Sequence, residues 1–275
     1  MPNDYIDLHL HTTASDGLLN PKEVVDAAAD RKLRAISITD HDTTDGFVSV
    51  IDYTREKGIE IIPGVELSCM YNGADVHILG YFIDYKDAEF MQAIKEYCRE
   101  RYNRGVAIVK KLNEIGINIK MDTVSDIAGE GAVGRPHVAQ ALVREEYVQT
   151  FDEAFARYLG YHAPAYVPKK HLDVDEAISM LHRIGGAAVL AHPGTLRHDD
   201  FIPHFAEAGL DGIEAYHSLH KRKDREHYKQ LAGKYGMFYS GGSDCHGPRK
   251  GSLLIGTQKV PYSCLEQMKE AMEKK

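Results

Sequence analysis

The stretch Tyr5-Ile6-Asp7-Leu8-His9-Leu10-His11 determines the architecture that the sequence predicts. Its polar and apolar residues alternate with a period of two, which is typical of a β-strand with one buried face. The apolar residues therefore face one side, and Asp7, His9 and His11 face the other. A lone histidine usually packs against its neighbours, but two imidazoles on one strand face can reach the same cation. The stretch predicts a strand that ends in two metal ligands.

Strands and helices alternate along the chain on both sides of a helical middle region. The residues Asn20-Pro21-Lys22-Glu23 combine an N-cap, a proline at the first helical position and a glutamate at the third, which predicts a helix to about Arg31. Hydrophobic patterns predict further strands at 35–39, 60–67, 76–81, 187–191, 212–217 and 237–242. They predict further helices at 46–57, 173–184, 223–235 and 263–273. This alternation indicates a mainly parallel α/β architecture.

The alternation is interrupted in the middle of the chain. A long helix is expected first, then three shorter helices and a strand, over residues 87–115, 122–128, 136–146, 152–158 and 165–167. We interpret residues 98–165 as a helical insertion. Residues 1–97 and 166–275 would then form one discontinuous α/β domain.

Composition limits the range of functions. The chain of 275 residues has a formal net charge of −8, which argues against a large nucleic-acid footprint built from basic side chains. A small phosphorylated substrate is compatible with this charge, because bound cations would reverse the local field. Four cysteines without a CxxC spacing predict reduced thiols. Without a signal-peptide pattern or a long apolar run, we expect a cytoplasmic protein with no membrane association and no obligate protein partner.

Side chains that can bind metals recur at the ends of the predicted strands. The chain has fifteen histidines, and the ones in question, with the carboxylates beside them, are His9, His11, His41, Glu66, His77, His192, His217, Asp244 and His246. In an α/β barrel the loops at the carboxyl ends of the strands meet on one face. Imidazole with carboxylate suits zinc, iron, manganese or cobalt better than calcium, and the surplus of ligands indicates more than one ion. A carboxylate such as Glu66 can bridge two ions. The pattern predicts a polynuclear metallohydrolase.

Five motifs within this pattern resemble those of the PHP (polymerase and histidinol phosphatase) superfamily. They are His9-Leu10-His11, Thr39-Asp40-His41-Asp42, Gly64-Val65-Glu66-Leu67-Ser68, Ala191-His192-Pro193 and Ser243-Asp244-Cys245-His246. They span nearly the whole chain apart from the predicted insertion. The insertion, with Gly134-Arg135-Pro136-His137, is similar to one branch, which contains nucleoside 3′,5′-bisphosphate phosphatases and 5′→3′ exoribonucleases.

The resemblance implies a distorted (β/α)7 barrel with two to three divalent ions of manganese, iron or zinc. The first ion would be held by His9, His11, Glu66 and Asp244. Glu66 would bridge to a second ion, completed by His77 and His192, and the third would be held by Asp16, His41 and His246. Many members of the superfamily have a histidine where this chain has Asp16. An oxygen ligand there favours manganese or leaves the third site weakly filled.

The remaining candidates concern catalysis and substrate binding. Such ions would activate water and neutralise phosphoryl oxygens, so Glu66 is expected to be essential for catalysis. His217 is expected either to be a general acid or to orient a ligand. The expected substrate-binding residues are Ser68, Arg135 and His137, with Lys169 and Arg249 as weaker candidates. An ordinary exposed arginine at a helix start explains Arg135 equally well.

Other polar residues are expected to support the site or to be solvated. We expect Asp7 and Asp40 to orient imidazoles. Solvated histidines are expected at five positions in charged or helical stretches, namely His182, His198, His204, His220 and His227.

These residues predict a metal-dependent phosphoesterase that acts on nucleotides. The expected substrate is the 3′-phosphate of a nucleoside 3′,5′-bisphosphate or a short 5′-phosphorylated RNA. The alternatives are a phosphatase for a small metabolite such as histidinol phosphate, and a catalytically silent module that binds metal and phosphate.

Overall fold

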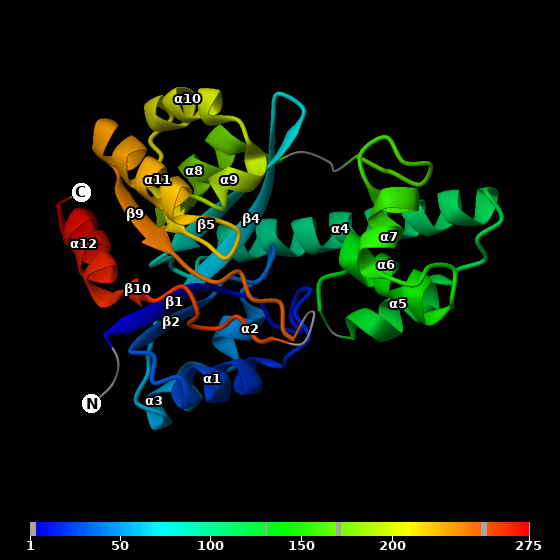
Figure 1. The fold of residues 1–275 in the computed structure, drawn as a ribbon, viewed down its shortest axis with the longest axis horizontal. Coiled ribbons are helices and arrows are strands. Elements are labelled where there is room, and N and C mark those ends of the chain that lie inside the picture. Colours follow the sequence, from blue (N-terminus) through cyan, green and yellow to red (C-terminus); the bar gives the residue numbers. More distant parts are fainter. Residues whose placement is uncertain (1–3, 130, 169–171, 249–251, 275) are drawn as a thin grey trace.

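The protein is an α/β structure with two mixed sheets, which confirms the predicted fold class (Figure 1). The computed structural model describes residues 4–129, 131–168, 172–248 and 252–274. Lys169 and Arg249, two of the predicted substrate-binding residues, lie outside this described part. No helix within it is long and apolar enough to cross a membrane. All four cysteines are free thiols, as predicted.

The first sheet is built on the strand that opens the chain. Its order is β10-β1-β2-β3, with bounds β1 Tyr5–Leu10, β2 Ala35–Ile38, β3 Glu60–Ile61 and β10 Val260–Pro261. β1, β2 and β3 run parallel, and β10 pairs with β1 in the antiparallel direction. Ile6, Leu8 and Leu10 are fully buried, as the alternation predicted.

The second sheet is larger and contains one reversed strand. Its order is β6-β4-β5-β7-β8-β9, with bounds β4 Gly64–Tyr71, β5 Ala74–Tyr81, β6 Leu172–Asp173, β7 Ala187–Leu190, β8 Gly212–Tyr216 and β9 Phe238–Gly241. β4 and β5 form a hairpin through Asn72 and Gly73, both of which have positive φ angles, as a type I′ turn requires. β5 is therefore antiparallel to both β4 and β7, while the other pairs in this sheet are parallel.

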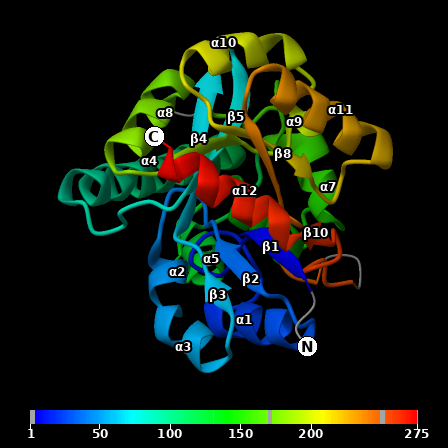
Figure 2. The ribbon, with the colours of Figure 1, turned by 90° about the vertical axis from the view of Figure 1, so that its left-hand side faces the viewer.

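The two sheets meet where the predicted ligands gather. Isolated parallel bridges join Leu10 to Cys245 and His41 to Glu66, and each bridge links one sheet to the other. Helix α12 (Tyr262–Glu273) lies across the junction, and its buried Leu265 and Met268 pack with side chains of both sheets (Figure 2). The closed seven-stranded barrel stays a prediction.

Short helices cover the sheets. They are α1 Pro21–Asp30, α2 Asp45–Val48, α3 Ile51–Glu56, α8 Val174–Arg183, α9 Pro193–Leu196, the 3-10 turn η2 Asp199–Phe201, α10 Ile202–Glu207 and α11 Arg222–Lys234. The predicted capping box of α1 is present, because the Asn20 side chain accepts from the Glu23 amide at 3.0 Å and Glu23 accepts from the Asn20 amide at 2.8 Å. The single helix predicted for 46–57 is wrong, since the backbone leaves the helical region at Val50 and separates α2 from α3.

The middle of the chain is helical and has a hydrophobic core of its own. Its elements are α4 Ala88–Glu114, α5 Met121–Ala128, α6 Arg135–Arg144, α7 Phe151–Ala154 and the π-helix η1 Phe155–Leu159. One buried cluster is formed only by residues between Ile108 and Ala165. The first half of α4 instead buries Phe90 and Ile94 in the core under the larger sheet. The predicted boundary at residue 98 therefore falls inside a continuous helix, and the division into domains stays a prediction.

No strand forms at 165–167, where the sequence predicted one. The backbone carbonyls there are taken by side chains of α4 instead of by a neighbouring strand. The Tyr166 carbonyl accepts from Lys111 Nζ at 2.7 Å, and the Val167 carbonyl accepts from Arg104 Nε at 2.8 Å. These hydrogen bonds hold residues 166–167 against helix α4.

Candidate metal centre

Strand β1 carries His9 and ends one residue before His11, and the two rings meet at one point. Their Nε2 atoms lie 3.1 Å apart, and both are buried. Glu66 Oε2 lies 3.2 Å from His9 Nε2 and 3.1 Å from His11 Nε2. Asp244 Oδ1 approaches the same two nitrogens at 3.4 and 3.1 Å. Side chains from β1, β4 and the segment after β9 therefore direct ligand atoms at a common position.

Glu66 is shared between two such positions. Its Oε2 lies 3.2 Å from His41 Nδ1, in addition to the contacts with the β1 histidines. Its Oε1 lies 2.8 Å from His77 Nδ1 and 3.0 Å from His192 Nε2. His77 can take part only because β5 is reversed, which brings the first half of that strand to the carboxyl end of β4. Glu66 therefore has the geometry of a bridging carboxylate.

A third group of ligand atoms lies next to the first. It consists of His11, Asp16, His41 and His246. His246 Nε2 lies 3.2 Å from Asp16 Oδ1, and the His246 ring stacks on His11 with a centroid distance of 4.1 Å. All the predicted metal ligands are thus brought together, from segments as far apart in the sequence as His9 and His246.

The chemistry of this cluster fits divalent transition metals. Within the described residues the Nδ1 atoms of His11 and His41 are buried and make no hydrogen bond of good geometry, although carboxylate oxygens of Asp16 and Glu66 lie 3.9 and 3.2 Å from them. A buried polar atom without a hydrogen bond is costly, and nitrogens that face carboxylate oxygens in this way are suited to bind a cation. Mixed imidazole and carboxylate donors suit manganese, iron and zinc.

Burial and the neighbouring charges set the protonation of the cluster. Burial alone would raise the pKa of Glu66, but the imidazoles of His41, His77 and His9 hold this pKa well below its usual range. Burial alone would lower the pKa of His11, yet its hydrogen bonds to Asp244 and Glu66 raise it to about 10 when no cation is bound. A cation that binds here must therefore displace protons.

Glu214 is a buried carboxylate that the sequence analysis missed. It is fully buried on β8, and its two oxygens have different tasks. Oε1 lies 2.9 Å from His9 Nδ1, and Oε2 accepts from the His192 amide at 2.8 Å. A carboxylate on the far nitrogen of a ligating imidazole fixes the ring and raises its basicity. The available signal was a charge inside an apolar strand, which needs a partner there.

Asp7 and Asp40 do not orient imidazoles, contrary to the prediction. Asp7 accepts from the amides of Ser243 at 2.8 Å and Gly256 at 2.7 Å, so it joins β1 to the segments after β9. Asp40 accepts from the amide and hydroxyl of Thr12, both at 2.7 Å, and from the Ser15 hydroxyl at 2.6 Å. These short polar donors lie within reach, so both carboxylates hold backbone and loop positions instead of rings.

Arg101 is a second residue that the sequence analysis missed. It extends from α4 to the rim of the cluster, where its Nε contacts Asp42 Oδ2 at 2.5 Å and its Nη2 donates to Ser68 Oγ at 2.7 Å. Asp42 also accepts from the Ser68 amide at 2.8 Å. Burial would lower the pKa of Arg101, but Asp42 raises it. The sequence carried no signal for this residue, because an arginine on a long helix is usually solvated.

Arg135 and His137, the predicted substrate-binding residues of α6, contact other protein groups in this structure. Arg135 Nη2 lies 3.1 Å from Asp75 Oδ2 on the β4–β5 hairpin. His137 is buried, and its Nδ1 accepts from the Gly134 amide at 3.0 Å. The part of these residues in substrate binding stays a prediction, as does that of Ser68.

His217 and His220 follow β8, and both are buried. His217 is buried, its Nδ1 accepts from the Leu219 amide at 3.2 Å, and its Nε2 lies 3.2 Å from Asp244 Oδ2. In the neutral ring this arrangement places the proton on Nε2, toward Asp244. The solvated histidine predicted at position 220 is wrong, because His220 is 5% exposed and bonds to the backbone of Gly194 and Ala215.

An α/β fold with a buried cluster of imidazoles and carboxylates is typical of metal-dependent hydrolases. Residues 7–236 match the family described as PHP domain, and the chain belongs to this family. The resemblance noted in the sequence is thereby confirmed.

Three similar proteins narrow this class. The chain is 34% identical to the 5′-3′ exoribonuclease Rnm of Salmonella typhimurium over 88% of this chain and 85% of that protein. It is 32% identical to the 3′,5′-nucleoside bisphosphate phosphatase of Chromobacterium violaceum over 94% of this chain and 93% of that protein. A crystal structure of a predicted metal-dependent phosphoesterase from Bifidobacterium adolescentis superposes with a TM-score of 0.88 at 26% identity, covering 97% of this chain and 96% of the other. The expectation of a phosphoric ester hydrolase is confirmed by these relatives.

Proposed function

We propose that the protein hydrolyses phosphate esters of nucleotides at a centre of two to three divalent ions. The expected substrate is the 3′-phosphate of a nucleoside 3′,5′-bisphosphate or a short 5′-phosphorylated RNA. The observation that carries the proposal is Glu66, whose two oxygens contact ligand nitrogens of separate groups within 3.2 Å. The names of the exoribonuclease and bisphosphate phosphatase relatives support the nucleotide substrate.

The proposed ligands are the three groups of the cluster together with His192, and manganese, iron or zinc would suit them. Bound ions of this kind lower the pKa of water and neutralise phosphoryl oxygens during in-line displacement. The chain's own contribution is to hold Glu66 and the imidazoles in a buried position with fixed tautomers. Glu214 does this for His9 by accepting from its far nitrogen. His217 holds a proton toward Asp244, so we propose it as a positioning residue or as the donor to the leaving group.

Three arginines on the helical segment would bind the charges of the substrate. Arg101 lies at the rim of the cluster and donates to Ser68. Arg135 lies close enough to Arg104 for the two positive charges to repel each other. Arg104 Nη2 is buried without a hydrogen-bond partner in the described part of the chain. Burial and the charge of Arg135 lower the pKa of Arg104 to about 10, as expected where cations crowd together. An anionic group of the substrate would relieve this crowding.

We also propose that residues 98–165 cover the active site, and that the two sheets form the distorted (β/α)7 barrel expected of the family. The Ala132 amide donates to the Ala14 carbonyl at 2.9 Å, which joins the loop before α6 to the loop that carries Asp16. Gly131 approaches the same loop so closely that an added Cβ would lie 2.3 Å from the Thr13 carbonyl oxygen. These contacts support a cover held against the metal centre. Cytoplasmic location stays a prediction.

The substrate can be tested by phosphate release from manganese-loaded protein. The panel is adenosine 3′,5′-bisphosphate, a 5′-phosphorylated oligoribonucleotide and histidinol phosphate, with release of nucleotide from the oligomer measured by chromatography. Selective turnover of either nucleotide supports the proposal. Preference for histidinol phosphate would favour a metabolite phosphatase, and no turnover of any member would favour the silent binding module.

A matched pair of variants tests the part played by the helical segment. Arg135→Ala is expected to raise the KM for the bisphosphate by about tenfold, the value of one charge-assisted hydrogen bond. Arg144→Ala removes an exposed arginine from the other end of α6 and is the control. Equal kinetics of both variants, with unchanged metal content, would remove Arg135 from substrate binding.

A further inference from the structure

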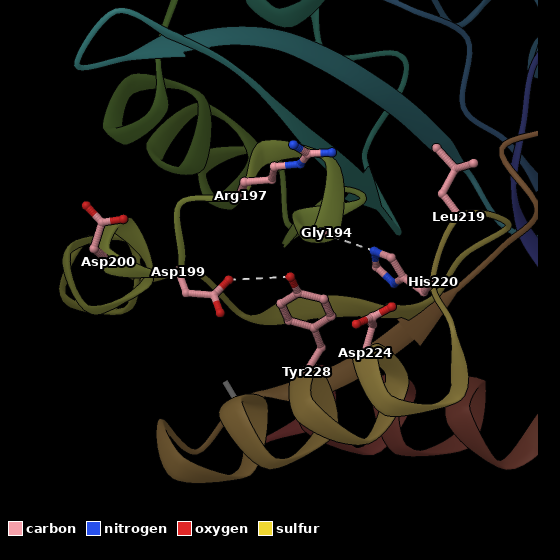
Figure 3. Close-up of a pocket in the computed structure, with 8 residues that line it drawn as sticks. All are labelled: Gly194, Arg197, Asp199, Asp200, Leu219, His220, Asp224 and Tyr228. Carbon is pink, nitrogen blue, oxygen red and sulfur yellow. Dashed lines mark hydrogen bonds between the residues drawn. The ribbon is translucent and has the colours of Figure 1, made fainter.

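A cavity of about 350 Å³ lies beside the metal centre, between the segments that follow β7 and β8 (Figure 3). Its volume is within the range of small-molecule sites. The side chains of interest in its lining are Arg197, Asp199, Leu219, His220, Asp224 and Tyr228. None of them has a part in the metal centre or in the arginine group described above.

A row of aromatic rings joins this cavity to the ligands. The His192 and His217 ring centroids lie 5.5 Å apart, those of His217 and His220 lie 5.1 Å apart, and those of His220 and Tyr228 lie 5.0 Å apart. His220 lines the cavity, which is therefore one ring contact away from His217, and His217 touches Asp244. This closeness relates the cavity to a substrate bound at the metal centre.

The wall of the cavity nearest the metal centre is fixed. His220 Nε2 accepts from the Gly194 amide at 3.1 Å, and its Nδ1 donates to the Ala215 carbonyl at 2.9 Å. The backbone passes so close that a Cβ on Gly194 would lie 2.7 Å from His220 Nε2. The segments after β7 and β8 are thereby held together, which makes this a preformed site and not a gap between mobile loops.

The rest of the lining presents a cation and an apolar group to solvent. Arg197 has a left-handed backbone, with φ of 58°, although it ends helix α9 at a place where glycine is usual. Its guanidinium has no hydrogen bond or ion pair within the described residues, and it projects over the cavity in Figure 3. Leu219 is 69% exposed, the highest value among the large apolar side chains described. Both groups are placed to receive a ligand.

The carboxylates of the lining determine which kind of ligand fits. Asp199 contacts His227 Nε2 at 2.6 Å and the Tyr228 hydroxyl at 3.4 Å, and Asp224 accepts from the Lys221 amide at 2.9 Å. A carboxylate can accept about four hydrogen bonds, so both keep free positions. Asp200 adds a third acid to the lining, against the single Arg197. A second phosphate would be repelled here, whereas a neutral group with N–H donors would be bound.

The geometry points to a binding site for the nucleobase of the nucleotide whose phosphate lies at the metal centre. A base has N–H donors for the carboxylates, ring acceptors and a π-face for Arg197, and an apolar face for Leu219. This inference rests on the proposed function, because it assigns the organic part of the same substrate.

The test uses a fluorescent reporter, since the chain has no tryptophan. Leu219→Trp places one at the rim of the cavity, and excitation near 295 nm avoids absorption by the base. Manganese-loaded Leu219→Trp protein is titrated with adenosine, which carries no phosphate and is not turned over. Ribose, inorganic phosphate and histidinol are titrated in parallel. Ile115→Trp, at an exposed position that ends α4, is the control for non-specific stacking.

We expect saturable quenching by adenosine in Leu219→Trp only, weakened about tenfold when Arg197→Ala is added and unchanged when Arg55→Ala is added. Arg55 is an equally charged but exposed residue on α3. Equal quenching by ribose, phosphate or histidinol, or equal affinity with and without Arg197, would overturn the assignment. Because adenosine binding needs no hydrolysis, quenching without turnover of any phosphate ester would instead show that the proposed function fails.

Discussion

Replacing Glu214 by glutamine tests whether the structure explains how the metal ligands are held. The carboxylate serves two donors, with Oε1 on His9 Nδ1 at 2.9 Å and Oε2 on the His192 amide at 2.8 Å. A glutamine has the same shape but only one accepting oxygen, so one of these donors must face an NH₂ group. The residue is fully buried, and no water can replace the lost acceptor without rearrangement.

The cost follows from general values for such bonds. Loss of a charge-assisted hydrogen bond that leaves a buried donor unpaired lowers the free energy of unfolding by about 2–3 kcal/mol. Loss of the carboxylate behind a ligating imidazole weakens metal binding by about 10- to 100-fold. Because Glu214 holds both His9 and His192, we expect the loss of metal affinity to lie toward the upper end of this range.

Manganese affinity is measured by isothermal titration, and stability by urea denaturation of the metal-free protein. Glu266→Gln, an exposed glutamate on α12, is the matched control and should leave both quantities unchanged. If Glu214→Gln binds manganese as tightly as the parent and unfolds at the same urea concentration, the proposed positioning of His9 and His192 is wrong.

Three further predictions concern other parts of the site. Arg101→Ala leaves the buried Asp42 carboxylate without its cation and should lower the free energy of unfolding by about 2–3 kcal/mol. Solvent screens this pair little, because the Arg101 side chain is only 16% exposed. A thermal melt identical to that of the parent would contradict the prediction. Manganese affinity should rise with pH between 6 and 9, by up to about tenfold per pH unit for each proton displaced. The reason is that the pKa of His11, raised to about 10, keeps a proton on this ring that competes with the metal throughout this range. Calorimetry at several pH values measures the affinity, and an affinity that does not change with pH would contradict the prediction. Gly242→Ala would bring a Cβ to 2.3 Å from the Cβ of His9 and displace this ligand. The metal content, measured by elemental analysis, should fall, and the free energy of unfolding, measured by denaturation, should drop by about 1–3 kcal/mol. Full metal content would contradict the prediction.

The sequence predicted the ligand set because the ligands are tied to strand ends. His9 and His11 follow from the period of two along β1, and His192 and Asp244 follow the strands β7 and β9. The single strand predicted for 60–67 is wrong, because the chain passes at Ile62 and Pro63 from β3 in one sheet to β4 in the other, which places Glu66 near the start of β4. The carboxyl ends of neighbouring parallel strands lie together, which gathers the residues that follow β1, β2, β7 and β9, and the bridge between His41 and Glu66 adds β4 to them. His77 needed the hairpin reversal at Asn72 and Gly73, whose dipeptide is itself a hairpin pattern.

The parts that failed depend on tertiary contacts that periodicity does not encode. Arg101 and Glu214 act through partners 59 and 205 positions away. The left-handed backbone of Asp42, His192 and Asp244 is equally non-local, since it costs about 1–2 kcal/mol per residue and persists only where the surrounding packing enforces it. His220 looked solvated because its neighbours in the sequence are charged, yet the backbone of Gly194 and Ala215 and the Tyr228 ring cover it. Similarly, Val50 interrupts a helix that its hydrophobic pattern would continue.

The central claim is that the buried cluster around Glu66 holds the ions at which a nucleotide phosphate ester is cleaved. The most direct measurement compares phosphate release from adenosine 3′,5′-bisphosphate by protein stripped of metal, by the same protein reconstituted with manganese, and by reconstituted Glu66→Gln. We predict release only by the reconstituted parent, with the bound manganese of Glu66→Gln reduced by at least one ion per chain. Release by the stripped protein, or by Glu66→Gln at the rate of the parent, would contradict the account.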